Sequence, residues 1–212
     1  MKIEQIAVGF MQVFCYLVYD EQTKEGILID PAGNEEDLLE HLRKEGIKLR
    51  YIVNTHGHAD HTCGNDTIRK ATGASVVMHK ADDLFFQRPE AIAAVRAMGF
   101  PACGPADVRV QDSDELSLGN LKMKFILTPG HTQGSCCILI EGNLFTGDTL
   151  FVGAVGRTDL PGGSFEQLIQ SIKNLVKTLP PDTVVWPGHD YGDRPSSTLG
   201  REAKTNPYIA EY

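Results

Sequence analysis

Short apolar runs rich in β-forming residues alternate with turn residues along the first third of the chain. Three of these runs predict strands, at 3–8, 13–19 and 26–30. The stretch Asp30-Pro31-Ala32-Gly33, which comes directly after the third run, is typical of a turn. The chain is therefore predicted to begin with paired strands.

A helix is predicted next, over 35–45. Leu38, Leu39 and Leu42 fall on one face of this segment. Asn34 can serve as its N-cap, and Gly46 ends it.

Strands and helices continue to alternate through the rest of the chain. Further strands are predicted at 51–54, 75–78, 121–127, 135–140, 143–146 and 183–186. Further helices are predicted at about 60–71, 91–98, 164–179 and 197–204, the third starting at a Ser164/Gln167 capping box. Each half is rich in strands and closes with a helix. Two sheets packed face to face, with helices outside, would satisfy this α+β pattern in one domain spanning residues 1–212.

Composition excludes several classes of protein. Of the 212 residues, 42% are hydrophobic and 23% are charged, which is ordinary for a globular protein. The net charge of −8 argues against binding to nucleic acid or anionic membranes. No apolar run approaches the roughly 20 residues of a membrane span. The first ten residues lack the apolar core of a signal peptide, so we expect a cytoplasmic protein.

The five cysteines show no CxxC spacing and are expected to be reduced thiols. One of the adjacent pair Cys136 and Cys137 is expected to face the core as a small apolar residue. We give neither a catalytic role.

Five of the seven histidines gather in three places, each after a predicted strand. They are His56, His58 and His61, then His131, then His189. A lone HxH or a lone Gly-Asp-Thr would be weak evidence of a metal site. The stretch His56-Gly57-His58-Ala59-Asp60-His61 is stronger, because four ligand-type residues fall within six positions at a strand end. Single His, Asp and His residues at later strand ends make chance a poor explanation.

The number of these residues favours two metal ions. One tetrahedral ion uses three protein ligands and leaves one position open, and seven candidates are too many for that. His56 and His58, two positions apart, can face one ion, whereas Asp60 and His61 can face a second. Asp148 is the natural carboxylate to lie between ions about 3.5–4 Å apart. Bound metals also lower the pKa of water to about 7, which supplies a nucleophile without Ser or Cys.

These motifs, taken together, resemble the metallo-β-lactamase superfamily. The matching stretches occur in the same order and are Thr55–His61, Pro129-Gly130-His131-Thr132, Gly147-Asp148-Thr149 and Pro187-Gly188-His189. The resemblance implies an αββα sandwich of two mixed sheets, with the site at one edge. It also implies that His56, His58 and His131 hold the first metal, that Asp60, His61 and His189 hold the second, and that Asp148 bridges them.

Within the superfamily, the chain is similar to the short bacterial form of glyoxalase II, the hydroxyacylglutathione hydrolases. The supporting stretch runs from Gly147 to Gly163. The similarity implies hydrolysis of a small-molecule thioester, with Asp60 and Asp148 as catalytic residues and a glutathione-like carrier thiol. Arg157 and Tyr191 match substrate-contacting positions, whereas Asp159 stands where the family has an aromatic residue. Arg157 could instead simply pair with Asp159.

Two divalent ions are expected, with zinc favoured and iron or manganese as alternatives, because His and Asp sites accept all three. The oligomeric state is left open, a dimer being one option.

The main alternative is a persulfide dioxygenase with a single iron. His56, His131 and Asp148 form a two-His-one-carboxylate set, which suits mononuclear iron(II). A third option is another hydrolase of the same fold with an unknown substrate. A β-lactamase is disfavoured, because that family usually lacks an aspartate such as Asp148 in the bridging role.

Overall fold

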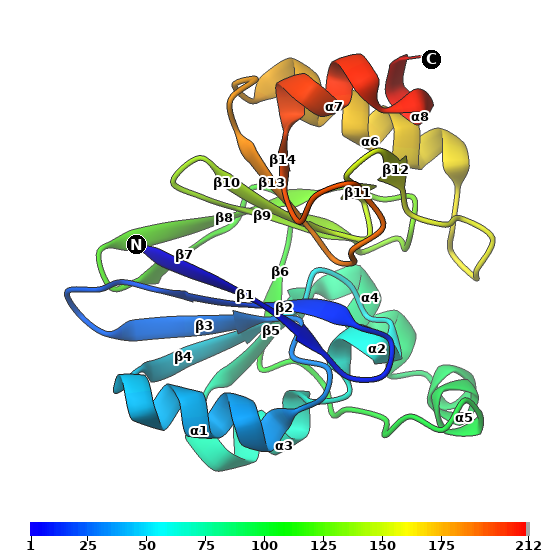
Figure 1. The fold of residues 1–212 in the computed structure, drawn as a ribbon. Coiled ribbons are helices and arrows are strands. Elements are labelled where there is room, and N and C mark those ends of the chain that lie inside the picture. The colour runs from blue at the N-terminus through cyan, green and yellow to red at the C-terminus, as the bar shows by residue number, and fades with distance from the viewer. Residues whose placement is uncertain (211–212) are drawn as a thin grey trace.

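The protein is built from four layers, as the computed structural model of residues 1–210 shows (Figure 1). Two six-stranded sheets lie face to face, and helices cover the outer face of each sheet. The αββα arrangement predicted from the sequence is therefore confirmed. Within residues 1–210, no helix is long and apolar enough to cross a membrane.

The first sheet is mixed and comes from the first half of the chain. Its strands lie side by side in sequence order: β1 (Lys2–Val8), β2 (Val13–Tyr19), β3 (Glu25–Ile29), β4 (Lys48–Val53), β5 (Ser75–His79) and β6 (Val108–Val110). The first three pair antiparallel, and β3 to β6 run parallel. The strands expected at 3–8, 13–19, 26–30, 51–54 and 75–78 are confirmed, whereas β6 was not predicted.

The second sheet is also mixed. Its order is β14 (Ser197–Thr198), β13 (Val184–Pro187), β10 (Asn143–Gly147), β9 (Cys136–Ile140), β8 (Leu121–Leu127) and β7 (Glu115–Leu118). Only β10 and β13 pair in parallel. The small strands β7 and β14 were not predicted, and neither was the two-stranded sheet of β11 (Leu150–Phe151) and β12 (Ala154–Val155).

Helices α1 (Glu35–Glu45) and α3 (Asn65–Thr72) cover the first sheet, and α6 (Phe165–Thr178) and α7 (Leu199–Thr205) cover the second (Figure 1). The shorter helices are α2 (Ala59–Thr62), α4 (Lys80–Phe86), α5 (Pro89–Ala97) and α8 (Pro207–Ala210). Helix α1 has the predicted bounds, but Asn34 does not cap it through its side chain. Asn34 adopts a left-handed conformation, and its Oδ1 accepts a hydrogen bond from the backbone N–H of Gly9.

The helix predicted over 60–71 is wrong as one element, because the chain breaks between α2 and α3. The N–H of Gly64 donates to the carbonyl of Pro31 and not to the preceding helical turn. Helix α4 was not predicted, and His79 caps it by accepting a hydrogen bond from the N–H of Ala81.

Both faces of each sheet are covered, and the burial pattern reflects this. Every residue of β2 is buried. Phe14, Tyr16 and Val18 belong to the core between the sheets, whereas Cys15 and Leu17 pack in the layer beneath α1 and α3. Burying a large apolar side chain stabilises the fold by roughly 1.5–3 kcal/mol.

The cysteine pair in β9 follows the same pattern. Cys136 lies in the core between the sheets, and Cys137 lies in the layer that includes Leu168 and Ile172 of α6. Cys136 is therefore the one that faces the core between the sheets, and Cys137 is buried as well because helices cover the second sheet.

Candidate metal centre

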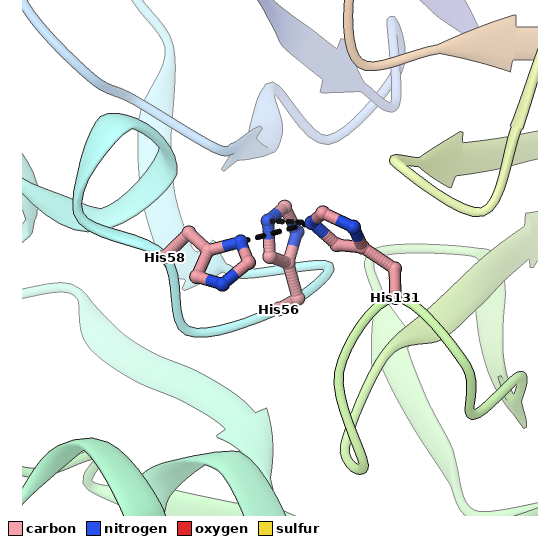
Figure 2. A group of neighbouring side chains, drawn as sticks. All are labelled: His56, His58 and His131. Atoms are coloured by element: carbon pink, nitrogen blue, oxygen red, sulfur yellow. Dashed lines mark hydrogen bonds between the residues drawn. The ribbon is translucent and has the colours of Figure 1, made fainter. Parts of the chain in front are cut away.

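The first group of histidines combines residues from both sheets. His56 and His58 follow β4, and His131 lies in the connection between β8 and β9. Their rings converge on one point (Figure 2). Nε2 of His131 lies 2.9 Å from Nδ1 of His58 and 3.2 Å from Nε2 of His56.

This first group is suited to a cation. Burial and the neighbouring histidines lower the pKa of His56 and of His58 well below the ordinary value. Their imidazoles are therefore neutral at pH 7, which is the form that binds a metal. The three ring nitrogens lie close enough together to share one ion.

The second group lies beside the first and consists of Asp60, His61 and His189. Nε2 of His61 is 3.3 Å from Nε2 of His189, and Oδ2 of Asp60 is 3.7 Å from the former and 3.8 Å from the latter. Asp60 and His61 lie in α2, and His189 lies two residues after the end of β13. This group also has the geometry of a metal site.

The second group differs from the first because carboxylates favour the protonated form of one of its histidines. Burial alone would lower the pKa of His61, but the carboxylates of Asp148 and Asp30 raise it to about 10. The same carboxylates would attract a metal cation in place of the proton on His61. The second group therefore stabilises a positive charge even though it is buried.

Asp148, at the end of β10, lies between the two groups. Its Oδ1 is 3.4 Å from Nε2 of His61, and its Oδ2 is 3.6 Å from Nε2 of His189 and 3.7 Å from Nε2 of His131. Oδ1 is buried and accepts no hydrogen bond from residues 1–210. A buried carboxylate oxygen that accepts no hydrogen bond is costly. Coordination of a cation would remove this cost, so the residues present fit a metal pair.

Backbone and side-chain acceptors orient the rings. Nδ1 of His131 donates to the carbonyl of Arg157 over 2.8 Å. The hydroxyl of Thr55 donates to Asp30, so it accepts from Nδ1 of His56, 3.0 Å away. In both rings Nε2 is left with a free lone pair directed into the site, which is how outer contacts select the tautomer of a metal ligand.

Asp30 belongs to this support, and sequence reasoning missed it. Its two oxygens accept from the N–H of Thr55, from the Thr55 hydroxyl and from Nδ1 of His61. Asp30 is also close to His56 and His61, but because its oxygens are already occupied we place it behind the ligands. In the sequence Asp30 was interpreted only as the first residue of the turn at 30–33. In the structure its φ of 51° is unusual for a residue other than glycine.

The two residues predicted to contact substrate lie beside the metal groups. Arg157 and Tyr191 line a cavity of about 440 Å³ that also contacts Asp148, Phe151, Phe165 and Tyr208. The ring of Tyr191 stacks on His189 with centroids 5.0 Å apart. Arg157 makes a two-pronged ion pair with Asp159, each N–O distance being 2.7 Å. The pairing considered from the sequence is therefore present, and Arg157 still borders the cavity.

Comparison with known proteins gives the family. The metallo-beta-lactamase superfamily profile matches residues 8–189. Hydroxyacylglutathione hydrolase GloC of Haemophilus influenzae is 31% identical over 213 residues, covering 99% of this chain and 98% of that protein. The human mitochondrial persulfide dioxygenase ETHE1 is 31% identical over 203 residues, covering 92% of this chain and 71% of that protein.

Solved structures agree with these sequence matches. The crystal structure of the BLEG-1 B3 metallo-beta-lactamase superposes with a TM-score of 0.88 at 32% identity, covering 98% of this chain and 99% of that one. TTHA1623 in a di-iron-bound form gives a TM-score of 0.83 at 33% identity, covering 97% and 99%. The extent of these matches, together with the two His/Asp groups at one edge of the sandwich, shows that this chain belongs to the metallo-beta-lactamase superfamily.

Proposed function

We propose that the protein is a metal-dependent hydrolase that cleaves a small-molecule thioester of the hydroxyacylglutathione type. His56, His58 and His131 would hold one divalent ion, and Asp60, His61 and His189 the other. The observation that carries the proposal is the place of Asp148, whose carboxylate lies within 3.7 Å of ring nitrogens from both groups.

When bound, two such ions polarise a carbonyl group and lower the pKa of water to about 7. The chain's own residues set the geometry of the reaction. Asp148 and Asp60 would offset part of the positive charge of the two divalent ions. The carboxylate of Asp60 stays ionised, because His61 lowers its pKa against the opposing effect of burial.

The cavity next to Asp148 is where a substrate would lie. Tyr191, stacked on His189, offers an aromatic surface close to the second group. Arg157 would approach an anionic part of the carrier thiol, such as a glutathione carboxylate. A thiolate leaves readily at neutral pH, because the pKa of a thiol is only about 8.5, so the site needs no separate acid.

Zinc is the ion we favour, and iron or manganese would also suit His and Asp ligands. The similarity to a hydroxyacylglutathione hydrolase, which covers 99% of this chain and 98% of that protein, supports a thioester substrate. We further propose that the protein acts in the cytoplasm. We also propose that residues 1–212 work as one domain, because both sheets contribute residues to the site.

A persulfide dioxygenase is the second candidate. His56, His131 and Asp148 lie together and offer the two-His-one-carboxylate set of a mononuclear iron site. The similarity to ETHE1 is a specific observation in its favour. The similarity to GloC covers 98% of that protein, against 71% of ETHE1, and this difference favours the hydrolase. Another hydrolase of this fold, including one that opens a lactam, is the third candidate.

The discriminating experiment uses purified protein loaded separately with zinc and with iron. Hydrolysis of S-lactoylglutathione that depends on metal would support the proposal. Oxygen consumption with glutathione persulfide, confined to the iron form, would replace it with the dioxygenase. Turnover of a chromogenic cephalosporin alone would favour the lactam hydrolase. Asp148→Ala protein is the control in each assay and should be inactive.

A further inference from the structure

A buried carboxylate on α4 joins the two chain segments that carry the first group of histidines. Asp82 is 1% exposed. Its Oδ2 accepts from the N–H of Gly57 over 2.8 Å and from the hydroxyl of Thr132 over 2.7 Å. Its Oδ1 accepts from the N–H of Gly134 over 2.7 Å. All three donors belong to ligand-bearing segments.

The positions of these donors matter for the metal group. Gly57 lies between His56 and His58, after a strand of the first sheet, and Thr132 follows His131, in a connection of the second sheet. One carboxylate therefore joins the two loops, beside the direct hydrogen bond from the N–H of Cys136 to the carbonyl of Thr55. The same two loops carry the ring nitrogens that lie 2.9 and 3.2 Å apart.

Close packing shows that α4 fits directly against both loops. A Cβ atom added at Gly134 would lie 2.6 Å from the backbone nitrogen of Asp82. A Cβ added at Gly57 would lie 2.1 Å from the ring of Phe86, which also makes an edge contact with His58. Glycine is thus required at Gly134, where an added side chain would meet backbone, whereas at Gly57 it would displace the ring of Phe86.

We propose that Asp82 is a positioning residue for the first metal ion, setting the spacing of His56 and His58 relative to His131. None of its hydrogen bonds within residues 1–210 reaches a ligand side chain, and it acts through the two loops. The inference rests on the metal site of the proposed function, but it holds for whichever substrate that site processes.

The next residue along the helix provides a matched control. Asp83 is also 1% exposed, but it faces a different part of the fold. It accepts from the N–H of Ala106 over 2.8 Å and pairs with Arg109 over 2.6 Å. Asp83→Asn should disturb α4 about as much as Asp82→Asn does, without touching a ligand loop.

The test measures metal binding in the full chain and needs no substrate. His189→Ala protein, which keeps only the first group complete, is titrated with cobalt(II) and followed by visible absorption and calorimetry. Adding Asp82→Asn should weaken cobalt binding by about 10–100-fold and alter the absorption bands, the usual effect of losing an outer contact. Adding Asp83→Asn should leave the affinity within about twofold, since it disturbs no contact to a ligand.

Equal affinities for the Asp82→Asn and Asp83→Asn proteins would overturn the inference. If Asp82→Asn does not fold, Thr132→Val removes one of the three hydrogen bonds and should weaken cobalt binding by roughly fivefold. An unchanged affinity in that variant would also overturn it. Failure of the otherwise unaltered protein to bind two ions would instead contradict the proposed function, so the two failures are distinguishable.

Discussion

The carboxylate of Asp30 accepts a hydrogen bond from Nδ1 of His61 over 2.9 Å, and both side chains are buried. The bond leaves Nε2 of His61 facing His189 and Asp148. Asp30 also accepts a hydrogen bond from the backbone N–H of Thr55. It therefore connects the end of β3 to the loop that carries His56 and His58. A single residue thereby orients one ligand and anchors the segment that bears others.

Asp30→Asn should therefore weaken the second metal site. The amide can accept on one side only, so either His61 or Thr55 loses its partner. We expect affinity for the second ion to fall by about 10–100-fold. Cobalt titration of His58→Ala protein, which lacks a ligand of the first group, isolates this site. Exposed Asp37, changed to Asn, is the control. Equal affinities in the Asp30 and Asp37 variants would contradict the assignment.

Asp148→Asn should abolish turnover and reduce metal content below two ions per chain. The reason is that both groups lie within reach of this one carboxylate. We expect a loss of at least about 100-fold in kcat, since removing an electrostatic contact to the reacting centre costs that much or more. Metal analysis and thioester hydrolysis measure both effects, with exposed Asp182→Asn as a matched change. Normal rates with two bound ions would contradict the bridging role.

Asp159→Ala should improve binding of an anionic thioester. In the unaltered protein Asp159 neutralises the charge of Arg157 through two hydrogen bonds of 2.7 Å, although both side chains are largely exposed. Freeing Arg157 should lower KM by roughly threefold with little change in kcat, a modest effect because water screens the charge. Arg157→Ala should raise KM. If neither substitution moves KM, Arg157 does not contact the substrate.

Removal of metal should destabilise the fold. Any ligand that binds only the native state adds stability, by about 2.7 kcal/mol when present at 100 times its Kd. Adding zinc to metal-free protein should accordingly raise Tm by roughly 6–10 °C for a chain of this size. Differential scanning fluorimetry measures the shift. Asp148→Asn protein should show a smaller rise, and an equal rise in both proteins would indicate that zinc binds elsewhere.

Phe145→Ala should cost about 3–5 kcal/mol of unfolding free energy. Phe145 is fully buried between the sheets and contacts Tyr16 and Trp186. Phe10, with 78% of its surface exposed, is the comparison, and Phe10→Ala should cost less than about 1 kcal/mol despite its stacking on Phe100. Urea unfolding followed by circular dichroism gives both values. Equal losses would mean that the core lies elsewhere.

The strands could be predicted, and the candidate ligands at 56–61 could be proposed, because their signals are local. The composition of runs such as 13–19 indicates a strand. The four ligand-type residues from His56 to His61 lie within six positions. The supporting residues could not be predicted in this way. Asp82 contacts Gly57, 25 residues before it, and Gly134, 52 residues after it, so no spacing in the sequence links them.

The smaller elements were missed for a related physical reason. β11 and β12 have two residues each and pair across the turn at Val152 and Gly153, so they are too short to give a periodic signal. The break between α2 and α3 depends on the carbonyl of Pro31, which lies in a different segment. Periodicity cannot reveal contacts of this kind, since they depend on tertiary structure.

The most direct test of the central claim is the rate of S-lactoylglutathione hydrolysis as zinc is added to metal-free protein. The account predicts that activity rises until two equivalents of zinc are bound per chain, because both His/Asp groups flank Asp148. Activity that saturates at one equivalent, or no hydrolysis at any zinc concentration, would contradict it.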